Sequence, residues 1–248
     1  DPVSGACEQL LQGHASDIVC VSVLPNKRIV SGSWDNTLRV WDPSTGACEQ
    51  VLKGHTEYVT SLGVLPGGRV VSTSFDTTLP IWNPSTGDCE QVMEGHTGVV
   101  LRMSMLPDKR IVSGSCDNTL RIWNPSTGAC EQVLKGHQKA ISGLDVLQNG
   151  RVISGSYDST VRIWNPSTGV CKRVLVHGPS GIHSMSILAD GRVITVSDED
   201  ARLWDPVTGA RVPIPARHCW FFMHAHLHAL PDGRVVSGAE NGTLLLWC

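Results

Sequence analysis

A histidine-rich stretch near the end of the sequence is the first candidate for chemistry. Residues 218–230 read HCWFFMHAHLHAL, in which His224, His226 and His228 alternate with small or apolar residues. Alternate side chains of a β-strand lie on one face about 6.6 Å apart, so two of these imidazoles could chelate zinc. A third ligand in the same line makes a poor tetrahedron, and histidines that pack or line a channel are the favoured interpretation. We therefore predict no metal site and no cofactor.

A second set of chemically capable residues recurs along the whole chain. Histidines, strand serines such as Ser31, and turn aspartates stand at matching positions, and these are the ingredients of a nucleophilic triad. A catalytic triad is needed once, whereas this set occurs four or five times. The repetition favours a structural role, in which buried polar groups satisfy one another, and predicts that the protein is not an enzyme. The residues are His14, His55, His96, His137 and His218, with Asp35, Asp76, Asp117 and Asp158.

The regular spacing of these residues comes from an internal repeat of 41 residues. The segment PSTGACEQVLKGH occurs at 43–55 and again, unchanged, at 125–137. Such similarity implies one structural part used six times. Each copy carries a tryptophan, at Trp41, Trp82, Trp123, Trp164, Trp204 and Trp247.

One copy, residues 55–96, predicts four short strands and no helix. The β-prone segments are YVTSLGVL (58–65), RVVSTS (69–74), TLPIW (78–82) and CEQVM (89–93), separated by turn-forming residues. Strands this close in sequence join through tight turns, so the sheet is an antiparallel meander. A small sheet that is apolar on both faces must stack against copies of itself, and a closed ring hides most sheet edges.

The order of these motifs resembles the WD-repeat β-propeller family over essentially the whole chain. Gly-His is followed by a strand, a Pro-Asp-Gly-Arg-like turn, Ser-Gly-Ser-x-Asp-x-Thr and Arg-Ile/Val-Trp-Asp/Asn. The resemblance implies four-stranded blades around a central channel, a His–Asp–Ser/Thr–Trp hydrogen-bonded cluster in each blade, and use mainly as a platform for other proteins. Residues 1–248 are expected to form a single all-β domain of six blades.

The two ends of the sequence predict how the ring closes. DPVSGACEQLLQGH at the start matches the stretch after a repeat tryptophan, and the chain ends just after a third strand. The N-terminal segment is therefore expected to supply the outer, fourth strand of the last blade. A ring trimmed from a longer one is the alternative.

Some copies depart from the shared pattern. The fifth has a shortened turn, SDEDARLW, and its histidine, His177, comes one residue early. Asn241 replaces the turn aspartate in the sixth copy. In the second, Pro80 stands where others carry arginine and removes a donor from the strand ladder.

The aromatic residues outside the repeat tryptophans predict a binding face. They stand immediately before the turn aspartate or in the loop that enters the first strand, and both places fall at one end of a meander. Exposed aromatics gathered at one end mark a binding surface, and the acids Asp17 and Glu240 beside them suit a peptide carrying Arg or Lys. The alternative is that the rings pack loop against loop. The aromatics are Trp34, Tyr58, Phe75, Tyr157, Trp220, Phe221 and Phe222.

The resemblance also implies contacts from the residues that flank the first-strand valine. These are Asp17, Val19, Tyr58, Thr60, Val99, Leu101, Ala140, Ser142, Gly181 and His183.

Charge and cysteine usage limit the partners and the compartment. A net charge of -3 argues against nucleic acid, and no apolar run approaches the roughly 20 residues that span a bilayer. Equivalent places in neighbouring copies lie too far apart for disulfides, so we expect free, mostly buried thiols and a reducing compartment, cytoplasmic or nuclear. We also expect a monomer. The cysteines in step are Cys7, Cys48, Cys89, Cys130 and Cys171.

Two function classes follow from these patterns. The favoured one is a non-enzymatic scaffold that binds a protein or peptide on the aromatic face. The other is a recently amplified or engineered repeat propeller with no specific ligand, which the near-verbatim copies support. Variety at one rim position, with Trp34, Phe75, Cys116 and Tyr157 in successive copies, favours the first class.

Overall fold

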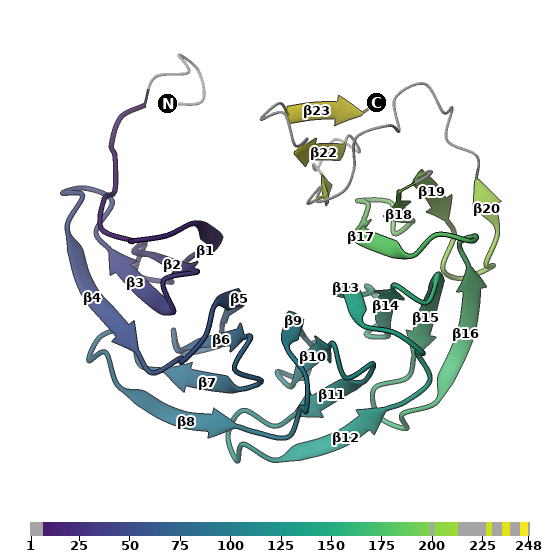
Figure 1. Cartoon of the computed structure of the whole chain (residues 1–248), viewed down its shortest axis with the longest axis horizontal. Helices are drawn as coiled ribbons and strands as arrows, with labels where there is room; N and C mark the ends of the chain where they lie inside the picture. The colour runs from purple at the N-terminus through teal and green to yellow at the C-terminus, as the bar shows by residue number, and fades with distance from the viewer. Residues whose placement is uncertain (1–6, 199–200, 213–226, 230–234, 239–243, 248) are drawn as a thin grey trace. The chain divides into compact units, whose positions relative to one another are not determined.

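The chain folds into small antiparallel sheets (Figure 1). The computed structural model describes residues 7–198, 201–212, 227–229, 235–238 and 244–247. No helix long and apolar enough to cross a membrane occurs within these residues. The chain divides into two compact units, Asp1–Met103 with Asn124–Cys130, and Ser104–Trp123 with Glu131–Cys248.

Unit 1 contains two four-stranded sheets whose strands lie side by side in chain order. The first consists of β1 (Ile18–Val23), β2 (Ile29–Ser33), β3 (Thr37–Trp41) and β4 (Cys48–Lys53). The second consists of β5 (Val59–Val64), β6 (Val70–Ser74), β7 (Leu79–Trp82) and β8 (Cys89–Met93). These bounds confirm the four strands that the sequence predicts for residues 55–96.

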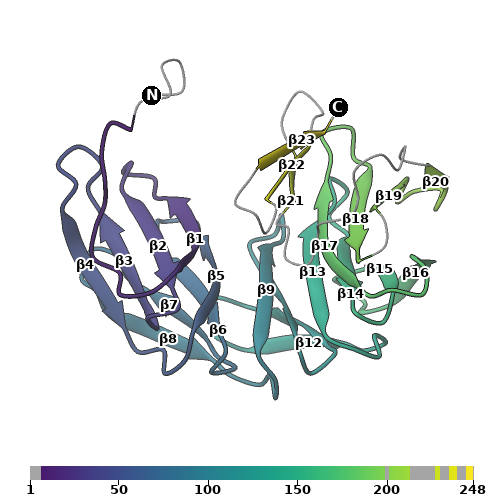
Figure 2. The same cartoon turned by 45° about the horizontal axis from the view of Figure 1, so that its top comes forward.

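Unit 2 contains two more such sheets, which lie next to each other (Figures 1 and 2). They are formed by β13 (Ile141–Val146), β14 (Val152–Ser156), β15 (Thr160–Trp164) and β16 (Cys171–Val176), and by β17 (Ile182–Ile187), β18 (Val193–Ser197), β19 (Ala201–Trp204) and β20 (Arg211–Val212). A three-stranded sheet follows, with β21 (Leu227–Ala229), β22 (Val235–Gly238) and β23 (Leu244–Trp247).

One further four-stranded sheet contains residues of both units. Its strands are β9 (Val100–Met105), β10 (Ile111–Ser115), β11 (Leu120–Trp123) and β12 (Cys130–Leu134). The described structure thus holds five four-stranded antiparallel sheets in sequence.

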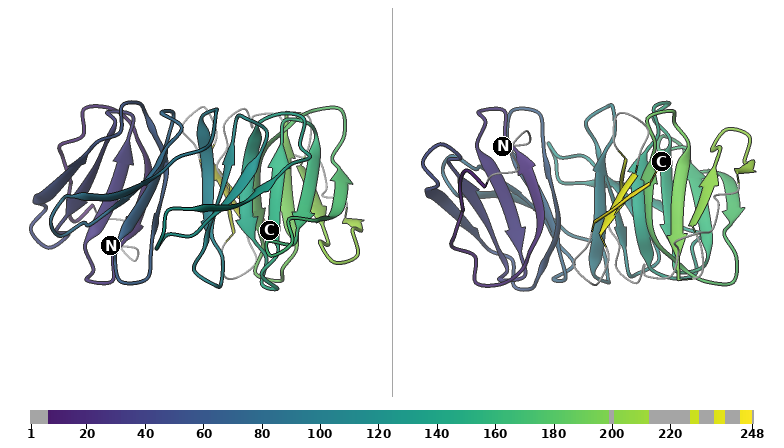
Figure 3. Two further views of the ribbon diagram at one scale, coloured as in Figure 1. Left: turned by 90° about the horizontal axis from the view of Figure 1, so that it is seen from below. Right: turned by 90° about the horizontal axis from the view of Figure 1, so that it is seen from above.

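Each meander places its turns at two ends. The turn between the first and second strands and the turn between the third and fourth lie at one end, and the turn between the second and third lies at the other. Seen edge-on, the strands run between these two ends (Figure 3). Residues that precede the first strand therefore share an end with residues that follow the second.

Neighbouring sheets within a unit pack face to face through apolar side chains. In unit 1, Val59 and Trp82 of the second sheet belong to the same buried cluster as Val30 and Leu38 of the first. Gly32 makes this approach feasible, because a Cβ atom there would lie 2.7 Å from Cγ1 of Val59. The recurring Ser-Gly-Ser motif therefore reflects close packing of one sheet on the next.

The periodic cysteines are free, but the expectation that they are mostly buried is wrong. All seven described cysteines are free thiols; Cys7 and Cys89 are exposed, and Cys48, Cys130 and Cys171 are half-buried. Each of these periodic cysteines except Cys7 is the first residue of the fourth strand of its sheet. A fourth strand lies at the edge of the sheet and pairs with a neighbouring strand on one side only. Cys219 and Cys248 lie outside the described residues.

Candidate functional site

The recurring polar residues form a linked cluster in the first sheet. The ring of His14 places Nδ1 2.8 Å from Oδ2 of Asp35 and Nε2 2.8 Å from Oγ of Ser31. Trp41 Nε1 donates a hydrogen bond to the same serine oxygen at 2.8 Å. Because the ionised carboxylate can only accept, Nδ1 carries the ring proton and donates to Asp35. In the neutral ring Nε2 is then an acceptor, and the serine hydroxyl donates to it.

The same cluster, with the same connectivity, recurs in other sheets. In the second sheet, His55 lies 2.6 Å from Asp76 and 2.7 Å from Ser72, and Trp82 donates to Ser72 at 2.8 Å. In the sheet β13–β16, the corresponding residues are His137, Asp158, Ser154 and Trp164, at 2.8, 2.8 and 2.9 Å. The hydrogen-bonded cluster expected from the family resemblance is therefore present.

The connectivity of each cluster is that of a Ser–His–Asp triad, but its burial prevents nucleophilic chemistry. Ser72 and Ser154 have no exposed surface, and Ser31 is 3% exposed. No substrate carbonyl can reach a hydroxyl in this position, and the hydroxyl already donates to histidine and accepts from tryptophan. The clusters satisfy buried polar groups and tie the entering loop, the second strand and the turn together.

The ionisation of the cluster residues follows from the same contacts. Burial alone raises the pKa of the Asp76 carboxyl, but hydrogen bonds from His55 and Thr78 outweigh it and hold the pKa well below its usual range. The pKa values of Asp35 and Asp158 are lowered in the same way. Burial lowers the pKa of His137, and the neighbouring carboxylate offsets this only in part.

The fifth sheet keeps part of this arrangement. Trp204 Nε1 donates to Oγ1 of Thr195 at 2.8 Å, so threonine replaces the strand serine. His177 is 1% exposed, and its ring centroid lies 6.3 Å from that of Trp204. The early position of this histidine, noted in the sequence, thus still leaves it in the interior.

Three aromatic rings form a continuous exposed row in unit 1. The centroids of Trp34 and Tyr58 are 5.7 Å apart with an interplanar angle of 24°, and those of Tyr58 and Phe75 are 5.6 Å apart at 52°. Their exposed fractions are 42%, 44% and 41%. We call Trp34, Tyr58 and Phe75 the aromatic row.

Backbone hydrogen bonds fix the loops that carry the row. The N–H of Trp34 donates to the carbonyl of Asp17 at 3.0 Å, and the N–H of Phe75 donates to the carbonyl of Tyr58 at 3.0 Å. Each bond joins the residue after a second strand to the loop that enters the first strand of the same sheet. These hydrogen bonds hold the loops in place, and each ring remains more than 40% exposed.

Unit 2 places its exposed tyrosine, Tyr157, beside a histidine that contacts an aspartate. The rings of Tyr157 and His183 meet edge-on with centroids 5.2 Å apart, and His183 Nε2 lies 2.7 Å from Oδ1 of Asp198. Asp198 was not predicted as a site residue. It stands at the repeat position of Trp34, so alignment of the fifth copy on the shared pattern would have found it.

The comparison with known families matches this architecture. The model described as WD domain, G-beta repeat matches residues 5–42, 46–83, 87–124, 128–165 and 169–205. The chain belongs to the WD40 repeat family. No curated protein matches the chain.

The predicted site residues of this WD40 protein fall into four groups. Trp34, Tyr58 and Phe75 meet in the aromatic row, and Tyr157 lies in unit 2 against His183. Asp17 is exposed at the entrance to β1. Trp220, Phe221, Phe222 and Glu240 lie outside the described residues.

The histidine-rich stretch of the last WD40 copy is described only in part. His218, His224 and His226 lie outside the described residues, and His228 in β21 pairs with Val236 in β22. Within the described residues, no group of three or more histidine, cysteine, aspartate or glutamate side chains is arranged to hold a metal ion.

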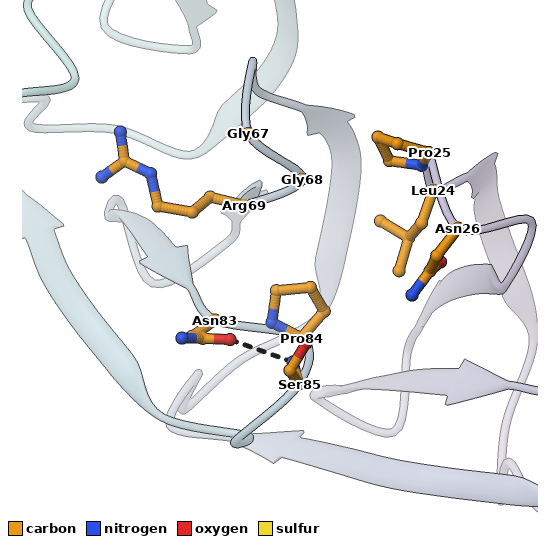
Figure 4. Close-up of a pocket in the computed structure, with 9 residues that line it drawn as sticks. All are labelled: Leu24, Pro25, Asn26, Gly67, Gly68, Arg69, Asn83, Pro84 and Ser85. Carbon is orange, nitrogen blue, oxygen red and sulfur yellow. Dashed lines mark hydrogen bonds between the residues drawn. The ribbon is translucent and has the colours of Figure 1, made fainter.

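The turns at the other end of the WD40 sheets enclose small cavities. One cavity of about 200 Å³ in unit 1 lies between the β1–β2, β5–β6 and β7–β8 turns, with Pro25, Gly68 and Pro84 in its wall (Figure 4). Equivalent turns of unit 2 enclose cavities of about 310 and 510 Å³. Because the same turns recur around each, the cavities follow from the packing of successive repeats and do not single out a ligand site.

Proposed function

We propose that this WD40 protein is a non-enzymatic platform that binds a protein or peptide through the aromatic row. The observation that carries the proposal is three contacting rings that each remain more than 40% exposed. The sheet does not require them, because Cys116 takes the equivalent position in the third repeat. The contacts between the rings agree with loop-to-loop packing, but packing alone would bury the faces that stay accessible.

The chemistry of this surface suits a basic side chain. The faces of Trp34 and Tyr58 attract a guanidinium or ammonium group through their negative π-surfaces. Asp17 is exposed and stands just before β1, and its carboxylate adds a negative charge that suits a basic side chain. Trp220, Phe221, Phe222, Glu240 and Tyr157 stay predicted contact residues on the sequence pattern alone. The partner is then a peptide with an exposed Arg or Lys.

The absence of catalysis is part of the proposal. The Ser–His–Asp arrangements of the sheets β1–β4, β5–β8 and β13–β16 are closed to substrate, because their serine hydroxyls are buried. Their recurrence in successive sheets also fits a structural role, since a single active site needs only one of them.

We also propose that residues 1–248 form one six-bladed propeller domain, closed by the N-terminal segment as outer strand of the last blade. Gln9 Nε2 donates to the carbonyl of Thr45 at 3.4 Å, as Gln50 Nε2 of β4 donates to that of Ser85 at 3.3 Å. Gln9 therefore contacts the β3–β4 turn of the first repeat in the way that Gln50 of a fourth strand contacts the same turn of the second repeat. A crystal structure with another blade number, or with residues 7–14 away from the last sheet, would contradict closure.

The compartment and assembly are extensions of the same proposal. Seven free cysteines within the described residues fit a reducing compartment, cytoplasmic or nuclear. A monomer is the expected state, because a closed ring needs no second copy to cover its faces.

An array with no specific ligand, either recently amplified or engineered, is the second candidate. The word-for-word recurrence of PSTGACEQVLKGH favours it, because unchanged copies show no sign of adaptation to a partner. The two candidates predict different results in a binding experiment, because an array with no specific ligand binds no peptide selectively.

A peptide library separates the two candidates. Peptides with one central Arg or Lys, and the same peptides with Gln there, are screened against the wild type and the Trp34→Ala/Phe75→Ala double variant. Val92→Ala is the matched control, since Val92 is also 45% exposed but lies on a fourth strand. We expect selective capture of basic peptides that only the double variant loses. Equal capture by all three proteins, or no selectivity in the wild type, would reject the aromatic row.

A further inference from the structure

The fourth strand of the fourth repeat differs from its counterparts in charge. The strands β4, β8 and β12 all begin Cys-Glu-Gln-Val, whereas β16 reads CKRVLV. Lys172 thus replaces a glutamate. Val176 replaces a charged residue, which is Lys53 in β4. Arg173 replaces a glutamine, so three of the six residues of β4 are changed in β16.

The replaced glutamate has a defined role in the first three repeats. It forms an ion pair with the arginine that comes just before the second strand. The N–O distances are 2.5 Å for Arg28–Glu49, 3.7 Å for Arg69–Glu90 and 3.3 Å for Arg110–Glu131. The equivalent residues of the fourth repeat are Arg151 and Lys172, which repel each other.

A second source of negative charge is also missing from the fourth repeat. Arg110 and Arg192 each pair with an aspartate in the preceding turn, at 2.8 and 2.5 Å. That turn carries Asn149 in the fourth repeat, and its side chain accepts from the backbone N–H of Arg151. Neither Arg151 nor Lys172 forms an ion pair with any residue in the described part of the chain. Two cations are therefore left for an external anion.

The strand that carries Lys172 is an open edge. In its sheet β16 lies last in the order β13-β14-β15-β16 and pairs with β15. Its alternating residues Lys172, Val174 and Val176 lie on one face and are all exposed, the two valines by 45% and 66%. Arg173 points to the other face, where its guanidinium donates to the carbonyl of Thr208.

The other fourth strands protect their edges with charge. Glu49 and Lys53 stand at the two ends of the exposed face of β4. In the second sheet, Val92 lies between Glu90, which is part of β8, and Glu94, which follows it. Charged side chains at such places oppose the pairing of edge strands with other chains. The face of β16 is apolar at one end and cationic at the other, so this protection is reduced.

We propose that the edge of β16 binds an extended acidic segment of a partner protein, which adds to the sheet as a fifth strand. Main-chain hydrogen bonds along the open edge provide the binding, as in other strand-addition complexes. A carboxylate of the segment pairs with Lys172 on the edge strand, while Arg151, which lies beyond the intervening β15, adds positive charge to the same face. β-branched side chains lie across from Val174 and Val176. The aromatic row takes no part, so this proposal and the proposed function can fail separately.

Charge complementarity decides the occupant. A basic segment would be repelled by Lys172 and Arg151, and a neutral one would leave both without a counter-charge. A second copy of the chain is the competing occupant, because the exposed face of β8 presents Glu90 and Val92. The two occupants differ in stoichiometry and in their dependence on protein concentration.

The test uses a fluorescein-labelled synthetic peptide of alternating glutamate and valine, and a second peptide of alternating lysine and valine. Binding to the full chain is followed by fluorescence anisotropy. We expect the acidic peptide to bind and Lys172→Glu to lower its affinity at least tenfold. In the Trp34→Ala/Phe75→Ala variant, which lacks the aromatic row, the acidic peptide should still bind and the basic peptide should fail. Lys172→Glu restores the ion pair of the other repeats, so it should not unfold the protein, and circular dichroism checks this.

A second variant tests whether the β16 pattern creates a binding edge when it is transferred to another repeat. Glu49→Lys combined with Lys53→Val copies the β16 pattern onto β4, and we expect the number of bound acidic peptides to rise from one to two. Equal binding of both peptides to the Trp34→Ala/Phe75→Ala variant, or an unchanged affinity of the acidic peptide in Lys172→Glu, would overturn the proposal. Self-association that Lys172→Glu abolishes, in sedimentation velocity and without peptide binding, would overturn it in favour of a second copy.

Discussion

Phe75 and Asp76 are neighbours in one turn, yet they belong to two different regions of the molecule. The carboxylate of Asp76 is buried in a cluster with His55, and the ring of Phe75 is 41% exposed beside Tyr58. The buried cluster recurs at the same place in other sheets with hydrogen bonds of 2.6 to 2.9 Å. The rim position changes from copy to copy.

This contrast shows how structure and recognition divide within a repeat. A residue that recurs in every copy meets a need of every copy, such as joining a loop to a strand. A residue that differs between otherwise identical copies is free of that need and can serve a single surface. By the same reasoning, the glutamates of β4, β8 and β12 serve the structure of each repeat, whereas Lys172 at the equivalent position of β16 can serve a single surface.

Removal of a cluster histidine should have the largest effect on stability. We expect His55→Ala to lower the free energy of unfolding by about 3 kcal/mol, because it removes the ring that links Asp76 to Ser72 and leaves the buried Ser72 hydroxyl without its acceptor. His177→Ala should cost less, since the turn of the fifth repeat is shortened and its histidine comes one residue early. Urea denaturation of both variants measures the difference. Equal losses would mean that the cluster is not what holds the repeat.

Acid should weaken the fold through the same clusters. The carboxyls of Asp35, Asp76 and Asp158 have lowered pKa values in the folded state, so their contribution is present above about pH 4 and is lost as the pH falls through the folded values. The lowered pKa of buried His137 acts in the same direction, because below about pH 6.5 protonation favours the unfolded chain. Stability should therefore fall steadily from pH 7 to pH 3.

The variant Asp76→Asn tests how much of this pH dependence comes from a single cluster carboxyl. It removes one titrating carboxyl, so its stability should fall less steeply below pH 4 than that of the wild type. Phe75→Ala is the control and should keep the slope of the wild type. A steeper slope in Asp76→Asn would show that the sign of the linkage is wrong.

Restoring the shared pattern in the second repeat should have a smaller, favourable effect. The β6–β7 ladder pairs at two positions, whereas β2–β3 pairs at four, since Pro80 lacks the backbone donor. Arg39 at the equivalent place lies 6.0 Å over the Trp41 ring. We expect Pro80→Arg to raise the free energy of unfolding by about 1 kcal/mol, through the ladder and a cation–π contact with Trp82. A fall in the thermal midpoint would contradict this.

Much of the fold could be predicted from the sequence because each repeat gives the same local signals. The segment CEQVM, for example, forms β8 within its predicted bounds. The thiol of Cys89 was placed wrongly, because a periodic position does not tell whether a strand is internal or at an edge. The repeated histidines could be assigned to clusters because one copy after another offers the same partners.

The site was only partly predictable for a different reason. The stacking of Trp34 on Tyr58 joins residues 24 positions apart on two sheets, and the pairing of His183 with Asp198 joins two strands of a repeat that departs from the pattern. Contacts of this kind depend on how loops meet in space, which periodicity does not encode. The pairing of Arg28 with Glu49 crosses an intervening strand and was missed for the same reason.

The most direct measurement compares Phe75→Ala with Asp76→Asn in parallel denaturation curves. The account predicts that Asp76→Asn loses at least about 2 kcal/mol, because it breaks a buried charged cluster. Phe75→Ala should lose less than about 1 kcal/mol, because its ring is largely at the surface. Equal losses, or a larger loss in Phe75→Ala, would contradict the division between a recurring structural cluster and a variable binding surface.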